Sequence, residues 1–476
     1  MEQPTRPIDE TSPLGRSTRW SALITVFTAG GSLLWMLVLT RLLSPADFST
    51  AALALAIVGL VLLFLQNGIP GSIIFRQEQR RDLLSALFWN NLALGLAGSL
   101  LLALSAFGVG LFFEDTRLPK VLLTIAPLPL VVAGGAVYKS IHLRDLSYRT
   151  IAGGELTAFL AGVGVSAGLA FSGYGYWAAV AQWAVRYAVE AVWYVVAGVG
   201  RFLPMRPSGN FKELKPHRQF TSGQWAERIT MYLNANLDTL MVGKLLGADA
   251  LGVYDVFKRL IARPTSMAGE WLDRFAFPLM ARNKEPSGVF FANTRLLSIL
   301  LAPMVVLGVL FAGPLLEVLT GEAWQGELRT FQWLVAAIAV GALAHPWDGL
   351  LAAVGRLRQL SLANIGYAVL LSAALWTGSV WGLEGIAIAQ AVVAPLWIML
   401  GYRLLIQPET GRGLAAFLYL PAKWGAVAVL CAAPAWIWQW SMGAQPAVQL
   451  LISTGLSFIV FYGTFIWKLT KPQPQP

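Results

Sequence analysis

The stretch RLLSPADFS at residues 41–49 separates two long apolar runs, and a similar pattern, KLLGADALG, returns at 244–252. In each copy a basic residue and two leucines lead into small and polar residues that favour turns and helix starts. A short polar stretch of this kind marks a place where an apolar chain reverses direction. Its return so much later in the chain predicts an internal duplication.

The composition indicates a membrane protein. Of the 476 residues, 56% are hydrophobic and 13% are charged, whereas soluble domains carry about 25% charged residues. The 19 tryptophans are typical of membrane–water interfaces. The net charge of +10 comes in small groups between apolar runs, which favours the membrane over nucleic acid as the partner. A single cysteine, Cys431, excludes an internal disulfide, and no Cys/His cluster offers a metal site.

A membrane-spanning helix needs about 20 mostly apolar residues. Fourteen segments meet this requirement: 20–43, 47–73, 83–113, 118–143, 150–172, 175–200, 218–243, 248–278, 288–313, 328–354, 358–380, 382–407, 415–440 and 446–469. The polar residues 1–19 contain no signal-peptide pattern and are expected to form a cytoplasmic segment.

Basic residues test this count, because Lys and Arg gather on the cytoplasmic side of a membrane. If the N-terminus is inside, most of the basic residues between segments fall in inside loops, including Arg76, Lys139 and Arg144. The outside loops then hold only Arg41, Arg117, Lys120, Lys244 and Arg329. The asymmetry persists to the last segment, so both termini are predicted to be cytoplasmic.

The repeated stretches lie six segments apart, which gives the two halves the same orientation in the membrane. The sequence therefore predicts an all-α polytopic membrane protein of two parallel-repeat lobes, a transporter architecture. The expected parts are a first six-helix lobe at 20–200, a cytoplasmic linker at 201–217, a second six-helix lobe at 218–407, and two further helices with a tail at 408–476.

Segments 7 and 8 carry charges at membrane depth, where each charge needs water or a partner. Asp255, Arg259 and Arg263 recur every four residues and share one helix face. One interpretation is a cationic cavity for an anionic head group, since Arg and Lys bind phosphate. Its basic residues are Arg228, Lys258, Arg259 and Arg263, and its supporting polar or coupling residues are Glu227, Asn236, Asp238 and Asp255. The alternative is internal pairing, for example of Asp255 with Arg259.

The first lobe carries fewer polar residues at membrane depth. Asn67 and Asn91 are candidates to bind sugar hydroxyls, but interhelical hydrogen bonds are the favoured interpretation. Arg186 and Glu190 are four residues apart and are expected to pair within their helix. His142 and His217 lie near loops and are expected at the surface. Pro346 is expected to kink segment 10.

Three features argue against an enzyme. The sequence has no GxxxxGK[ST] motif, no catalytic pattern and no large soluble loop. No cofactor is therefore expected. Uphill transport would draw on a Na⁺ or H⁺ gradient, or on the chemistry of partner proteins.

Four stretches carry a family resemblance: TRLLSPADFSTAALALAIVGL…NGIPGSIIFRQ, FWNNL, GYGYWAAVAQ and NANLDTLMVGKLLGADALGVYDVFKRL. They resemble the Wzx-like polysaccharide exporters and oligosaccharide flippases of the multidrug/oligosaccharidyl-lipid/polysaccharide exporter superfamily, over residues 18–410. The family's polar pair falls on Asn236 and Asp238, and its YxxxxRL pattern on Tyr254, Arg259 and Leu260. Ser49 departs from the usual glycine.

The resemblance implies a bacterial inner-membrane protein that moves an undecaprenyl-pyrophosphate-linked oligosaccharide across the membrane by alternating access. Membrane lipids, a polysaccharide polymerase and glycosyltransferases are the partners it implies. Two alternatives stay open: a cation-coupled multidrug extruder, whose cavity should carry unpaired acids, and a membrane scaffold for polysaccharide assembly enzymes, which needs larger loops.

Overall fold

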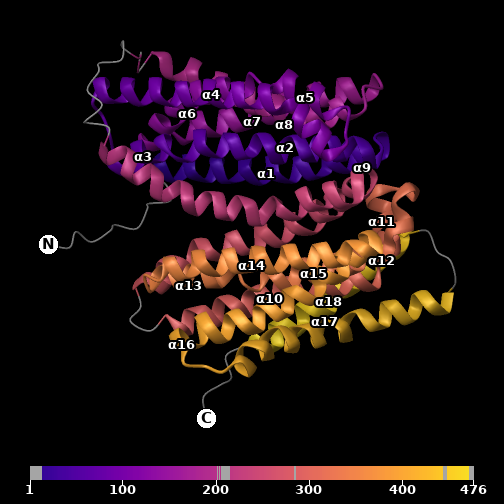
Figure 1. Ribbon diagram of the computed structural model, residues 1–476. Coiled ribbons are helices and arrows are strands. Elements are labelled where there is room, and N and C mark those ends of the chain that lie inside the picture. Colours follow the sequence, from indigo (N-terminus) through magenta and orange to yellow (C-terminus); the bar gives the residue numbers. More distant parts are fainter. Residues whose placement is uncertain are drawn as a thin grey trace. The chain divides into compact units, whose positions relative to one another are not determined.

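The computed structural model describes residues 13–200, 202, 204, 215–282, 286–442 and 447–470 (Figure 1). These residues contain helices and no strand. Within them, eight helices are long and apolar enough to cross a membrane, or nine if one bent pair counts as one span. The predicted all-α membrane class is confirmed. Most of the predicted cytoplasmic segment 1–19 and of the linker 201–217 lies outside the described residues.

The chain forms two compact units, residues 1–252 and 253–476. The first unit contains α1 (Pro13–Leu42), α2 (Pro45–Asn67), α3 (Ile69–Arg76), α4 (Arg81–Phe113), α5 (Leu118–Ile125), α6 (Leu128–Arg144), α7 (Tyr148–Phe171), α8 (Tyr176–Val199) and the first part of α9 (Lys215–Arg282). Its long helices run side by side in Figure 1.

The second unit contains the rest of α9 and the helices that follow it: α10 (Ser287–Leu310), α11 (Ala312–Thr320), α12 (Leu328–Ala342), α13 (His345–Ala353), α14 (Leu357–Gly378), α15 (Gly382–Gly401), α16 (Gln407–Thr410), α17 (Leu414–Met442) and α18 (Ala447–Thr470). Each of the fourteen predicted segments corresponds, in the described ranges, to a helix, to a broken pair of helices or to part of α9.

The two copies of the repeated stretch interrupt helices by different means. In the first copy Ser44 caps α2: its hydroxyl accepts from the Asp47 backbone N–H, and the Asp47 carboxylate accepts from the Ser44 N–H. Pro45 occupies the first turn, where its missing N–H is no loss. In the second copy Gly247 breaks α9 at a φ of 83°, a conformation that glycine adopts readily.

Within the first unit the two copies also touch. A Cβ atom at Gly252 would lie 1.8 Å from the carbonyl oxygen of Pro45. Only a residue without a side chain fits there, so Gly252 allows α9 to lie against the start of α2. The division between the two compact units follows Gly252, while the lobe boundaries and the linker expected at 201–217 stay a prediction.

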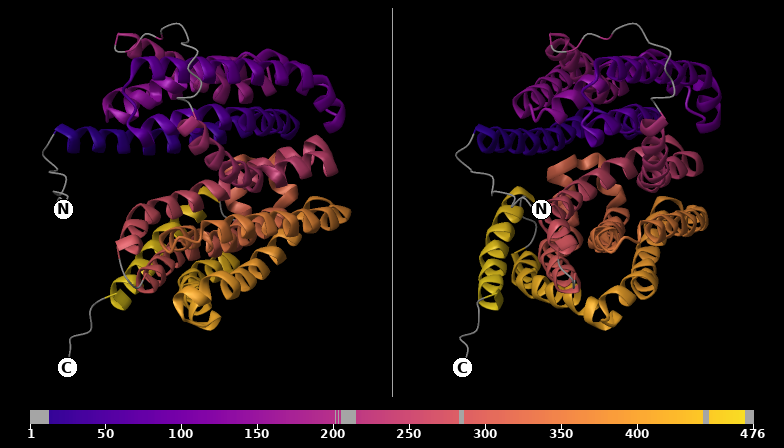
Figure 2. Two further views of the ribbon diagram at one scale, coloured as in Figure 1. Left: turned by 60° about the vertical axis from the view of Figure 1, so that its left-hand side comes forward. Right: turned by 90° about the vertical axis from the view of Figure 1, so that its left-hand side faces the viewer.

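The duplication is visible in the neighbours that each helix has. In the first unit α7 packs on α8, α6 on α8, and α4 on α6; in the second unit α14 packs on α15, α12 on α15, and α10 on α12. These are the same pairs shifted by six predicted segments, as an internal duplication requires. In the second unit, helix α17 packs on α10 and helix α18 on α11. Helix α18 lies at the edge of this unit (yellow in Figure 2).

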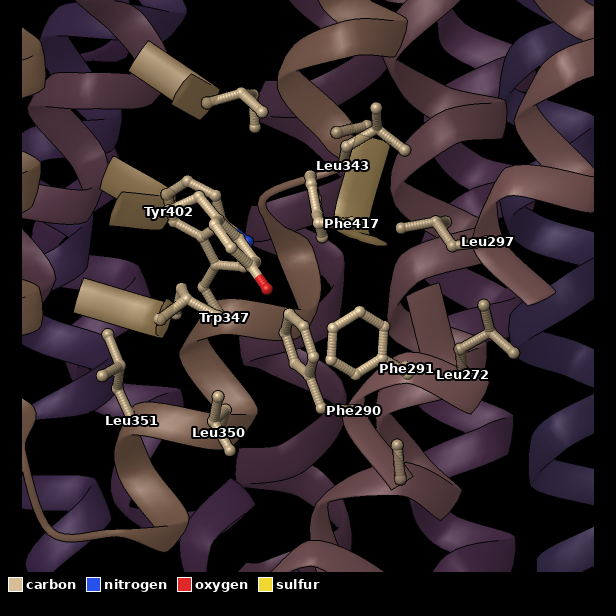
Figure 3. Close-up of a cluster of buried hydrophobic side chains, with 14 of the residues drawn as sticks. Leu272, Phe290, Phe291, Leu297, Leu343, Trp347, Leu350, Leu351, Tyr402 and Phe417 are labelled. Carbon is tan, nitrogen blue, oxygen red and sulfur yellow. The ribbon is translucent and has the colours of Figure 1, made fainter. Parts of the chain in front are cut away.

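A cluster of large rings forms the core of the second unit (Figure 3). The chain breaks between α12 and α13 beside Pro346, as predicted, and this break places Trp347 in the core. The rings of Tyr402 and Phe417 lie 4.7 Å apart between centroids. Aromatic burial of this kind dominates core energetics and holds α13, the π-helical turn Tyr402–Ile406 after α15, and α17 together.

Candidate functional site

The first unit contains a cavity of about 320 Å³. Residues from α2, α3, α6, α8 and α9 line it, and the polar ones are Gln66, Lys139, Ser140, Tyr187, Glu190, Tyr194 and Arg228. The remaining wall is formed by small and aliphatic residues. A concave site with a few convergent polar groups is the usual form of a ligand site.

The close approach of α6 and α8 builds one wall of the cavity. A Cβ atom at Gly135 of α6 would lie 2.5 Å from the Cα atom of Ala191 in α8, so the two backbones meet where Gly135 has no side chain. Lys139 lies one turn beyond Gly135, and Glu190 directly precedes Ala191. Their side chains consequently meet, with Lys139 Nζ 2.6 Å from Glu190 Oε1.

Tyr194 adds a polar group to the same wall. Its side chain is 1% exposed, and Lys139 Nζ lies 5.5 Å from the centroid of its ring. Its buried hydroxyl has no hydrogen-bond partner among the described residues. A buried polar atom without a partner costs about 1–3 kcal/mol, so this hydroxyl is suited to bind a ligand or water in the cavity.

Arg228 reaches the cavity because α9 is fixed to α2 one turn further on. The hydroxyl of Tyr232 donates to the carbonyl oxygen of Ala56 over 2.8 Å. A Cβ atom at Gly59 would lie 2.3 Å from that hydroxyl, so a larger residue there would displace the Tyr232 side chain from this contact. Arg228 itself is exposed, and in the described part of the chain it forms no ion pair. Among the described residues of the cavity wall, Arg228 is therefore the cation that no carboxylate neutralises.

The other three predicted basic residues belong to the second unit. Arg259 Nε lies 2.7 Å from Asp255 Oδ2, and Asp255 is buried. The internal pair that the sequence offered as an alternative is thus formed. Lys258 is half-buried, Arg263 is exposed, and both have partners. A substrate-binding role for these three residues stays a prediction.

The supporting polar residues mostly bond within the helical framework. Asn91 donates to the carbonyl oxygen of Ala133 over 3.0 Å and joins α4 to α6, as the favoured interpretation expected. Asn236 donates to the Tyr232 carbonyl within α9. Asp238 is buried and accepts from the Thr239 N–H. The side chains of Asn67 and Glu227 lie outside the described residues.

Lys139 and Glu190 are not among the site residues predicted from the sequence. The sequence places Lys139 in an inside loop and predicts a pair of Glu190 with Arg186, whereas in the structure Lys139 lies within α6 and pairs with Glu190. The helix period contained a usable signal. Tyr187, Glu190 and Tyr194 follow the i, i+3, i+7 spacing of one helix face.

Both histidines expected at the surface are buried instead. His142 is 1% exposed and His217 is 2% exposed. His217 precedes the predicted span at 218–243; its Nδ1 lies 2.9 Å from the Ser72 hydroxyl and its Nε2 lies 3.6 Å from a Glu78 carboxylate oxygen. Burial, together with the nearby Arg76 guanidinium, lowers the pKa of His217 below its ordinary value, although Glu78 acts in the opposite direction. No cluster of metal-ligating side chains occurs in the described ranges.

Two units of apolar helices share one pattern of helix neighbours, and the first contains a polar cavity; such an arrangement is typical of membrane transporters. A family described as "Polysaccharide biosynthesis protein" matches residues 38–328, and the chain belongs to this family. The resemblance inferred from the sequence is thereby confirmed.

Relatives support the same assignment. The chain is 24% identical over 417 residues to the lipopolysaccharide biosynthesis protein WzxC of Escherichia coli, covering 85% of this chain and 83% of that protein. It is 25% identical over 316 residues to the succinoglycan biosynthesis transport protein ExoT of Rhizobium meliloti, covering 65% and 63%. It is 24% identical over 349 residues to the teichuronic acid biosynthesis protein TuaB of Bacillus subtilis, covering 72% and 71%.

Solved structures share the fold. The lipid II flippase MurJ, in an inward closed conformation, matches with a TM-score of 0.73 at 11% identity, covering 95% of this chain and 99% of that one. An inward-facing multidrug transporter of the MATE family matches with a TM-score of 0.57 at 15% identity, covering 80% and 95%. At these identities the likeness establishes the fold alone.

Proposed function

We propose that this protein is a flippase of the bacterial inner membrane. It turns an undecaprenyl-pyrophosphate-linked oligosaccharide from the cytoplasmic to the periplasmic leaflet by alternating access, and both of its termini are cytoplasmic. Membership of the polysaccharide biosynthesis family and the transporter fold support this proposal. The observation that carries it is the cavity of the first unit with Arg228 in its wall.

The chemistry of the cavity suits a diphosphate. Arg keeps its charge at every physiological pH, and its planar guanidinium can bond two phosphate oxygens at once. The Tyr194 hydroxyl from α8 and Lys139 from α6 line the same cavity as Arg228. The amide of Gln66 and the phenol of Tyr187 provide hydrogen-bonding groups for sugar hydroxyls.

The size of the cavity limits how much substrate it holds. A volume of about 320 Å³ equals that of roughly ten molecules of liquid water. This accommodates a diphosphate and the sugar next to it, but not a complete oligosaccharide with its lipid. With the N-terminus cytoplasmic, α2, α6 and α8 each run from the periplasm to the cytoplasm, and Gln66, Lys139 and Tyr194 come from their second halves. The head group is therefore taken up from the cytoplasmic side.

A cation-coupled drug extruder fits these residues less well. Glu190 is the one carboxylate among the described residues of the cavity wall, and it is already neutralised by Lys139. The wall as a whole carries an excess of positive charge, which repels cationic drugs. A Na⁺ or H⁺ gradient, or the consumption of flipped substrate by a polymerase, supplies the direction of transport.

The test is complementation of a deletion strain. Arg228→Ala should abolish surface polysaccharide, and Arg228→Lys should restore part of it, because a lysine keeps the charge but loses the bidentate geometry. Arg149→Ala is the matched control, since Arg149 is an exposed arginine of the same unit that does not line the cavity. Full polysaccharide from Arg228→Ala at normal protein levels would refute the proposal. New sensitivity of the deletion strain to cationic drugs would favour the extruder.

A further inference from the structure

Glu190 in the cavity wall has two basic residues near it in space or along its helix, Lys139 and Arg186. Lys139 Nζ lies 2.6 Å from Glu190 Oε1, and both side chains line the cavity. Lys139 is therefore neutralised by the protein at the place where an anion would use it. One turn earlier on α8, Arg186 is half-buried and forms no ion pair among the described residues.

We propose that Glu190 is an exchangeable counter-ion that gives Lys139 to the phosphate of the substrate and then pairs with Arg186. In the empty cavity Glu190 holds Lys139. When a phosphate enters, the Lys139 ammonium moves to a phosphate oxygen, and the Glu190 carboxylate turns along α8 to the Arg186 guanidinium. This inference rests on the proposed function, because it assigns a residue switch to the same cavity.

Electrostatics explains why the exchange needs Arg186. A half-buried carboxylate that loses its partner is strongly destabilised, so Lys139 cannot leave unless Glu190 finds another cation. Residues four apart on a helix are neighbours, and Arg at position 186 and Glu at position 190 have this spacing. The exchange changes side-chain torsions only and leaves α6 and α8 in place.

A phosphate in the cavity can accept hydrogen bonds from donors that Glu190 does not use. Glu190 is 16% exposed and Lys139 is 38% exposed, so the ammonium already reaches the cavity and has donors to spare. The Tyr194 hydroxyl, which has no partner in the described part of the chain, lies on the same wall. An entering phosphate accepts from both Lys139 and Tyr194.

The pair also acts as a filter on charge. A neutral or cationic ligand cannot replace Glu190 at Lys139, because it offers no oxyanion. A diphosphate carries more charge and more acceptor oxygens than one carboxylate and does displace it. Discrimination arises from the group that must be displaced as well as from the new contact, which is a general route to specificity.

The test measures the binding of inorganic pyrophosphate to the purified full-length chain in detergent by isothermal titration calorimetry. Glu190→Gln removes the competitor and should tighten binding about tenfold, or about 1.4 kcal/mol. Arg186→Gln removes the alternative partner and should weaken binding about fivefold in the wild-type background. In the Glu190→Gln background, Arg186→Gln should change the affinity less than about twofold.

This double-mutant cycle separates exchange from simpler roles. If Arg186 contacted the phosphate directly, its loss would weaken binding equally in both backgrounds, and that result would overturn the proposal. An affinity of Glu190→Gln equal to or below that of the wild type would also overturn it. Glu190→Asp, which shortens the side chain but keeps the charge, provides a second variant if Glu190→Gln fails to fold. Its affinity for pyrophosphate should lie between that of the wild type and that expected for Glu190→Gln.

The outcome also distinguishes this inference from the function beneath it. If pyrophosphate binding depends on Arg228 but not on the Glu190–Arg186 cycle, the counter-ion exchange is wrong and the flippase proposal stands. If the wild-type protein binds no pyrophosphate, both are wrong.

Discussion

The close contact between α6 and α8 predicts that a side chain at Gly135 destabilises the first unit. Replacing Gly135 with alanine places a Cβ atom 2.5 Å from the Cα atom of Ala191 and 2.7 Å from its carbonyl oxygen. Both obstacles are backbone atoms, so no rotamer change relieves the overlap. The two helices must separate by about 1 Å to restore ordinary van der Waals distance. The 2.6 Å contact between Lys139 and Glu190 then lengthens as well.

The magnitude follows from two opposing terms. Alanine in place of a helical glycine stabilises by about 0.5–1 kcal/mol. Overpacking of a tight contact costs about 1–3 kcal/mol. Gly134 provides a matched control, since it is the adjacent glycine of α6 and a Cβ atom there meets nothing within 4 Å. Gly135→Ala should therefore be less stable than Gly134→Ala by about 1–3 kcal/mol.

Two assays read this prediction. Thermal unfolding of the purified variants should give Gly135→Ala a lower melting temperature than the wild type, and Gly134→Ala an equal or higher one. Surface polysaccharide in the complemented deletion strain should fall for Gly135→Ala only. If Gly135→Ala matched Gly134→Ala in both assays, the close approach of α6 and α8 would not be a requirement of the site.

Three further variants test how the first unit is held together. Tyr232→Phe removes the hydrogen bond to Ala56 and should cost about 1 kcal/mol, with a loss of polysaccharide export because Arg228 is no longer held in place. Gly252→Ala should lower the melting temperature, while Gly425→Ala, where a Cβ atom meets nothing, should not. The pKa of His217 lies below its ordinary value of 6.5, so on acidification the unfolded state takes up a proton before the folded state does. The stability that His217 contributes is therefore present above pH 6.5 and is lost below it. His217→Asn should make the melting temperature depend less on pH between pH 7.5 and about 5.5.

The fold could be predicted from the sequence because membrane-spanning helices are recognisable from the length and the apolar composition of their segments. The repeated stretch located the duplication, and the structure shows each copy interrupting a helix, through the Ser44 cap in one and through Gly247 in the other. The spacing of basic residues set the expected orientation. These signals depend on residues close together in the sequence, so they can be interpreted without knowing how the helices pack.

The site was harder to predict because it depends on contacts between helices. Lys139 and Glu190 are 51 residues apart, and their meeting depends on the absence of a side chain at Gly135. Charged residues at membrane depth led to the prediction of a cationic cavity at segment 8, where Arg259 instead pairs with Asp255. Burial of His217 likewise arises from the packing of α9 and not from its position near a loop.

We propose that Arg228, in the cavity of the first unit, binds the diphosphate of a lipid-linked sugar during flipping. The most direct measurement is the flipping rate of an undecaprenyl-diphosphate-linked fluorescent sugar in proteoliposomes that contain the purified protein. We expect rapid flipping by the wild type and by Arg149→Ala, and at least a tenfold lower rate for Arg228→Ala, a factor that corresponds to about 1.4 kcal/mol. Equal rates for all three proteins would contradict it.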